Sequence, residues 1–156
     1  MKYRKILTFL IVVSSVILCM SCKHYISDKY YCFDDYVWNV KDTLNYEFSV
    51  MDTSEDYTVK FNLRVDDSYR YRNMYMFTKT IFPDKSEKID TLQFLICDEY
   101  GNVYGKSLSG NNELEFVIDP KARFEQQGNY LFQVEHGMRD VNLEGVECVG
   151  FMILKN

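Results

Sequence analysis

The clearest pattern along the chain is a strict alternation of apolar and polar residues between residues 57 and 66. Tyr57, Val59, Phe61, Leu63 and Val65 alternate with polar residues, a period of two that places the five apolar side chains on one face of a β-strand. Burying each large side chain contributes about 1.5–3 kcal/mol, so this strand contributes on the order of 10 kcal/mol before conformational entropy is counted. We therefore expect its register to be tightly fixed.

Shorter alternating segments recur along the chain, and turn-forming residues separate them. The apolar positions of these segments are Tyr46, Phe48 and Val50, then Leu114, Phe116 and Ile118, then Tyr130, Phe132 and Val134. The turn signals are Pro83-Asp84, Gly101-Asn102, Gly110-Asn111 and Gly128-Asn129. Residues 74–82 and 146–154 are apolar on both faces or nearly so, which is typical of strands buried centrally or beneath a second layer.

These patterns predict an all-β domain. The 13 Tyr and 11 Phe residues favour strands, and helical periodicity is weak, with room for at most one or two turns near residues 119–127 or 139–143. Eight or nine short strands with frequent turns indicate a single antiparallel β-sandwich or jelly-roll-like domain.

The first 22 residues have the layout of an export signal. Three of the first five residues are basic, and the following fifteen carry no charge. This run is shorter than the roughly 20 apolar residues that span a membrane. Its end, with Ser21 before Cys22, resembles the lipobox of bacterial lipoproteins, in which the cysteine is lipidated and becomes the first residue of the mature chain. A plain secretory signal cut near Ser21 and an uncleaved anchor are the alternatives.

We accordingly predict a signal peptide at residues 1–21, a lipidated tether at 22–29 and one β domain at 30–156. Cleavage after Ser21 removes Lys2, Arg4 and Lys5 and no acid, so the formal charge falls from −5 to −8. An acidic domain without a basic stripe disfavours nucleic acid as a partner. The expected partners are a membrane, through lipid on Cys22, and other envelope proteins.

Three cysteines remain once Cys19 is removed and Cys22 is acylated: Cys32, Cys97 and Cys148. An odd number allows at most one disulfide, and the spacings match no zinc signature. We expect Cys97 and Cys148 to be small apolar core residues, with a bridge between them as the alternative.

The inventory of catalytic residues is small. The chain has two histidines, His24 and His136, and His136 fits a strand end or turn better than a general base. Paired acids such as Asp66-Asp67 and Asp98-Glu99 adjoin expected turns, so loop acids are a better interpretation than a glycosidase pair or a calcium site. No GxSxG, HExxH, P-loop or GxGxxG motif occurs, and we predict no enzymatic activity, metal or cofactor.

Aromatic residues provide the candidate interaction surface. Trp38, Tyr71 and Tyr75, with Tyr69, could form a platform for a sugar or another protein. Aromatic residues that alternate along strands are more often core residues, so burial is the competing interpretation.

The order and spacing of several segments resemble the gliding-motility lipoproteins of Bacteroidota called GldH, over nearly the whole chain. Besides the lipobox, the matching segments are Tyr36-Val37-Trp38, Phe61-Asn62-Leu63-Arg64 and residues 73–77, 90–92, 98–106, 128–132, 136–139 and 143–151. The resemblance implies a non-enzymatic envelope lipoprotein associated with gliding and, by extension, type IX secretion. It supplies no catalytic residues.

We therefore expect a docking protein that acts through protein-protein contacts, with a carbohydrate-binding lipoprotein as the alternative. Surface-exported lipoproteins of this phylum tend to carry acids after the lipidated cysteine. Here Lys23-His24-Tyr25 follows, which favours the periplasmic face of the outer membrane.

Overall fold

The computed structural model describes residues 24–108 and 110–156, which form eleven β-strands and no helix, so no helix among them could cross a membrane. The strands are β1 (Tyr25–Cys32), β2 (Val37–Asn39), β3 (Leu44–Val50), β4 (Tyr57–Val65), β5 (Asn73–Ile81), β6 (Glu87–Leu95), β7 (Lys106–Leu108), β8 (Asn111–Ala122), β9 (Gly128–His136), β10 (Asn142–Glu144) and β11 (Val146–Lys155). The prediction of an all-β domain is confirmed, and the helical turns allowed near residues 119–127 and 139–143 do not occur.

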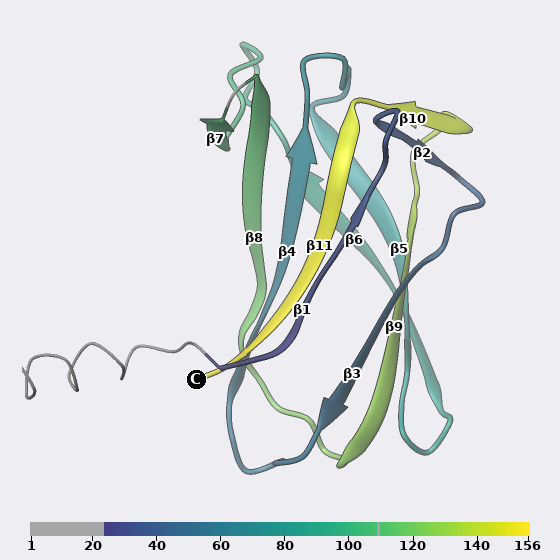
Figure 1. Cartoon of the computed structure of the whole chain (residues 1–156), viewed down its shortest axis with the longest axis vertical. Helices are drawn as coiled ribbons and strands as arrows, with labels where there is room; N and C mark the ends of the chain where they lie inside the picture. Colours follow the sequence, from purple (N-terminus) through teal and green to yellow (C-terminus); the bar gives the residue numbers. More distant parts are fainter. Residues whose placement is uncertain (1–23, 109) are drawn as a thin grey trace, which may run out of the picture.

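The strands form two sheets and a small ribbon (Figure 1). One sheet, called sheet A, has the order β1-β11-β4-β8-β7, and the other, sheet C, has the order β3-β9-β5-β6. Strands β2 and β10 pair separately. All neighbouring strands are antiparallel, and the two sheets face one another as a sandwich.

Both ends of the described chain lie at one end of the sandwich, which we call the proximal end (Figure 1). Strand β1 begins there beside the last residues of β11, and the Lys155 amide donates to the His24 carbonyl at 2.9 Å. The loops β3–β4 and β8–β9 and the β5–β6 turn lie at this end as well. The β2–β10 ribbon and the end of β1 lie at the opposite, distal end.

The predicted core strand is confirmed. Tyr57, Phe61, Leu63 and Val65 on β4 are each at most 2% exposed, whereas Val59 is partly buried. Strand β11 pairs with both β1 and β4 and is buried on both faces, as expected from its apolar sequence. The two strands therefore form the centre of sheet A.

The first strand differs from the prediction, because the residues expected to form a tether up to residue 29 are largely β1. Its polar residues, Ser27, Asp28 and Lys29, are accommodated because β1 is an edge strand with one solvated face. Its side chains also close one side of the sandwich: the Lys29 ammonium and the Tyr31 hydroxyl both donate to the Asn45 carbonyl of β3, at 2.8 and 2.6 Å.

The cysteine prediction is wrong in its pairing. Cys148 forms a disulfide with Cys32, its direct partner in the β1–β11 register. Cys97 is the free thiol and is only partly buried. The disulfide therefore fastens the distal end of β1 to the central strand of its sheet.

Trp38 and His136 pack together in the distal core. Trp38 is completely buried, its indole N–H donates to the Asp42 carbonyl at 2.9 Å, and its ring stacks on Phe33. His136 ends β9, as expected for a strand-end residue, and its ring meets the Trp38 ring edge-on at 5.3 Å. His136 is 1% exposed, and neither ring nitrogen has a hydrogen-bond partner among the described residues.

Burial lowers the pKa of His136 below its usual range, although the Trp38 backbone and the carboxylates of Asp140, Asp42 and Glu135 oppose this shift in part. The unfolded chain therefore takes up a proton at a higher pH than the folded chain does. A histidine of this kind contributes stability above its unfolded pKa of about 6.5 and loses it as the pH falls.

We predict that the disulfide stabilises the fold by about 2–5 kcal/mol, the range seen when native disulfides are removed. Cys32→Ala with Cys148→Ala should lower the free energy of unfolding by that amount, as measured by urea denaturation. A reductant should destabilise the unmodified protein and leave the double variant unchanged. Cys97→Ala is the matched control, and an equal loss in that variant would contradict the assignment.

We predict that His136→Phe flattens the fall in stability between pH 7 and pH 5. Each unit by which burial lowers the histidine pKa corresponds to about 1.4 kcal/mol lost on full protonation. The measurement is the free energy of unfolding in urea at both pH values. Equal falls in both proteins would show that His136 is not the group responsible.

Candidate functional site

The sequence singled out four residues, and the structure places them differently. Cys22 lies outside the described residues. Trp38 is 0% exposed, so the expectation that it contributes to an accessible surface is wrong; its indole fills the space between Phe33 and His136 in the core. An aromatic sugar platform built on Trp38 is therefore ruled out.

Tyr71 and Tyr75 lie beside the same short loop, residues 137–140. The Tyr71 hydroxyl donates to the Asp140 carboxylate at 2.7 Å, and this hydrogen bond raises the pKa of Tyr71. The Tyr75 carbonyl accepts a hydrogen bond from the Gly137 amide at 2.7 Å. Tyr71 is half-buried, whereas Tyr75 is 38% exposed, so Tyr75 offers the more accessible ring.

Tyr75 belongs to a larger exposed apolar surface on the outside of sheet C, which we call the β5–β6 face. Its members are Tyr75 and Phe77 on β5 and Ile89 and Leu95 on β6, and Phe77, Ile89 and Leu95 are 51%, 71% and 57% exposed. The register places Phe77 beside Thr91 and Tyr75 beside Gln93. Four apolar side chains on the outside of one pair of strands are the most prominent candidate for a contact surface.

The β5–β6 face corrects the prediction for residues 74–82. Their apolar sequence suggested burial on both faces, but only Met74, Met76 and Thr78 are buried, and no second layer covers the other side among residues 24–108 and 110–156. The sequence did contain one sign that the outer side of this strand is exposed. Lys79, a charged residue, lies on the same side as Phe77, and its ammonium pairs with the Glu87 carboxylate at 2.9 Å.

Gly137 brings the loop close against this face. A methyl group in place of its hydrogen would lie 3.1 Å from the Phe77 ring and 3.3 Å from the Tyr75 Cβ. The Tyr75 amide also lies 3.3 Å from the Met138 sulfur. Tyr75 and Phe77 therefore pack against the backbone at Gly137 and are not surrounded by solvent on all sides.

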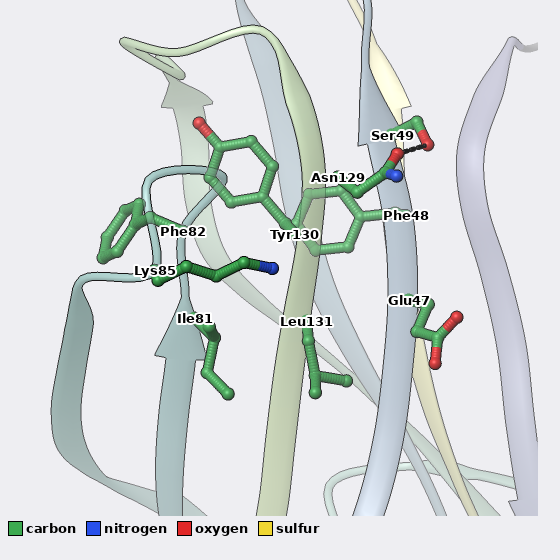
Figure 2. Close-up of a pocket in the computed structure, with 9 residues that line it drawn as sticks. All are labelled: Glu47, Phe48, Ser49, Ile81, Phe82, Lys85, Asn129, Tyr130 and Leu131. Carbon is green, nitrogen blue, oxygen red and sulfur yellow. Dashed lines mark hydrogen bonds between the residues drawn. The ribbon is translucent and has the colours of Figure 1, made fainter.

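Sheet C is hollowed next to this surface (Figure 2). A depression of about 670 Å3 lies over the proximal halves of β3 and β9. In Figure 2, Lys85 reaches over it from the β5–β6 turn, Glu47 flanks it from β3, and Asn129 accepts a hydrogen bond from Ser49 at 2.6 Å on its floor. A second hollow of about 280 Å3 extends the depression towards Phe77.

The acids near turns shape the backbone. Three turns repeat the sequence Asp-X-Ser, at Asp52, Asp66 and Asp84, and in each the aspartate Oδ1 accepts hydrogen bonds from the amide and the hydroxyl of the serine two residues later. These bonds, with one from Gln126, lower the pKa of Asp84 to about 2. The interpretation of these residues as loop acids fits this arrangement.

The described residues bring no catalytic constellation together. They contain no group of three or more His, Cys, Asp or Glu side chains that could hold a metal ion. His136 is sealed in the core, and Asp98 is engaged by the Tyr100 and Asn102 amides at 2.8 and 2.9 Å. The arrangement presents an apolar contact face and a mixed polar depression, both suited to binding.

Comparison with known proteins identifies the family. A family model described as GldH lipoprotein matches residues 25–153. The chain is 27% identical to the "Gliding motility lipoprotein GldH homolog" of Christiangramia forsetii, with 98% of each chain covered. It is 24% identical to the "Gliding motility lipoprotein GldH" of Flavobacterium johnsoniae, with 92% of this chain and 93% of that protein covered.

Among solved structures, a carbohydrate-binding module specific for non-crystalline cellulose aligns at a TM-score of 0.43 and 10% identity, over 80% of this chain and 69% of that one. Similarity at this level supports no shared function. The family model, in contrast, covers almost all of the described residues. The chain belongs to the GldH lipoprotein family.

Proposed function

We propose that this protein is a lipid-anchored, non-enzymatic docking protein of the cell envelope that serves gliding motility and type IX secretion. The observation that carries the proposal is the family match over residues 25–153, together with two relatives named as gliding motility lipoproteins. The lipobox at Ser21-Cys22 adds the means of attachment.

The position of β1 supports an anchor at Cys22. Strand β1 begins at Tyr25, so three peptide steps, which span at most about 10 Å, separate Cys22 from the folded domain. The proximal end would therefore rest close to the membrane surface, and the distal end would point away from it. Several acyl chains on one residue make desorption slow.

The outer membrane, facing the periplasm, is the proposed location. Lys23 and His24 follow Cys22, at positions where surface-exported lipoproteins of Bacteroidota tend to carry acids. The β5–β6 face would then stand perpendicular to the membrane, accessible to another envelope protein from the side.

A docking role fits the chemistry of the domain better than catalysis does. Three of its aspartates, Asp52, Asp66 and Asp84, close turns, and its distal histidine is buried. The exposed features are Tyr75, Phe77 and the two apolar residues of β6, and aromatic and aliphatic side chains of this kind form the centres of protein interfaces.

We predict that Cys22→Ala abolishes lipid attachment and releases the domain from the membrane. Metabolic labelling with a palmitate analogue and membrane fractionation are the measurements. Cys19→Ala is the matched control and should be labelled and retained like the unmodified protein. A labelled Cys22→Ala protein would place the anchor elsewhere.

We predict that deleting the gene impairs colony spreading or secretion of cargo proteins. Phe77→Glu with Ile89→Glu should fail to restore either property, because charges on the β5–β6 face prevent an apolar interface. Val117→Glu is the control, since Val117 is 52% exposed on β8 of the opposite sheet. Spreading and secretion that remain unchanged on deletion would refute the motility and secretion role.

A further inference from the structure

The two sides of the sandwich differ. On one side, β1 and β3 contact one another and Tyr31 and Lys29 bridge them. On the other side, β6 is the last strand of sheet C, and the seam between it and β8 is open in its proximal half. An apolar cleft of about 270 Å3 enters the sandwich through this seam.

Core side chains are accessible through the cleft. Leu92 on β6, Ile118 on β8 and Phe132 on β9 line it and remain only partly buried. Its deepest part reaches Phe151 and Ile153 on β11, at the centre of sheet A. The interior of the domain is thus incompletely filled along one edge.

The same edge offers unpaired backbone. Strand β6 is nine residues long, and none of residues 24–108 or 110–156 pairs with its outer side. Its outward side chains include Ile89 and Leu95, the most exposed apolar residues of the β5–β6 face. Its inward side includes Leu92 at the cleft. Apolar surface therefore lies on both faces of a strand whose hydrogen-bonding edge is free.

We propose that β6 accepts an extended segment of another envelope protein as an added strand of sheet C. That segment would be rich in Val, Ile or Leu. Because side chains of a strand alternate between its two faces, every second side chain would enter the cleft and the others would lie over Ile89 and Leu95. The proposal rests on the docking function above and specifies its mode.

Two charged residues protect this strand edge from unspecific pairing in the free protein. Lys88 and Asp90 point towards the cleft mouth and pair at 2.8 Å, and inward charges are a known protection of edge strands. Their side chains are 64% and 50% exposed. An exposed ion pair is weak, so both side chains can turn outward into water when a strand arrives.

Other occupants fit the edge less well. An acyl chain could enter the cleft but would leave Ile89 and Leu95 on the outer face of β6 uncovered. A second copy pairing antiparallel through β6 would point the two proximal ends in opposite directions, which opposes anchoring of both copies in one membrane. A strand from a different protein meets neither difficulty.

The test is photocrosslinking in cells that express the full-length lipoprotein. A photoreactive amino acid at Thr91 or Gln93, exposed and outward on β6, should give one discrete adduct with another protein. The same group at Val117, which is exposed on β8 of the opposite sheet, is the control and should give none. Mass spectrometry should place the crosslinks on alternate residues of one apolar segment.

Ile89→Lys and Leu95→Lys change exposed side chains and should fold normally, which circular dichroism would check. Each should reduce the adduct about tenfold, the effect of losing roughly 1.4 kcal/mol of burial. A synthetic peptide copying the crosslinked segment should protect the β6 amides from hydrogen exchange, and a scrambled peptide should not.

Each other outcome has a defined meaning. Adducts only at other surfaces would overturn strand addition and leave the docking function intact, whereas no adduct from any surface would overturn both. A crosslinked second copy would replace the proposed partner. Tight binding of dansyl-labelled undecanoic acid to the purified protein, lost when Leu92→Lys blocks the cleft, would assign the cleft to lipid and refute the proposal.

Discussion

The packing of Phe151 holds the two sheets together. This residue lies on β11, an inner strand of sheet A between β1 and β4, and its ring stacks on Phe132 of β9 at 4.5 Å. It also meets Phe61 of β4 at 5.3 Å and Tyr46 of β3 at 5.4 Å. Each aromatic pair contributes about 0.5–1.5 kcal/mol beyond the burial of its area. Both sheets therefore share one aromatic centre, formed by Phe151, Phe132, Phe61 and Tyr46. The strands that pair with β11 and β9 are positioned relative to this centre.

The cleft and the β5–β6 face lie away from these aromatic contacts. Sheet C continues past β9 to β5 and β6, and β6 packs on sheet A chiefly through Phe94, whose ring meets Phe116 at 4.5 Å. Proximal to this contact the sheets separate and the cleft opens. The apolar β5–β6 face lies on the outside of the same two strands, so this edge of the domain carries exposed apolar residues on its outer side and an open cleft on its inner side.

The sequence predicted the strands whose two faces differ in chemistry, and β4 is the clearest example. It could not predict β1, because an edge strand needs few apolar residues and the polar residues Ser27-Asp28-Lys29 resemble a linker. The Cys32–Cys148 pairing depends on the β1–β11 register, a contact between residues 116 apart, and local patterns carry no such information. Trp38 was ambiguous for a related reason: an aromatic residue in a short segment fits a surface or a core equally well.

The disulfide has a mechanical consequence for a domain tethered at its beginning. Tension on the proposed anchor enters at Tyr25 and peels β1 from β11 one hydrogen-bonded pair at a time, starting opposite Leu154. Strands resist peeling far less than they resist shearing. Peeling of β1 nevertheless stops at Cys32, because the disulfide to Cys148 holds that end of β1 on β11. A pull of this kind would extend the molecule by no more than β1 and would uncover the side of the sandwich that Lys29 and Tyr31 close, while the disulfide keeps β1 attached to β11.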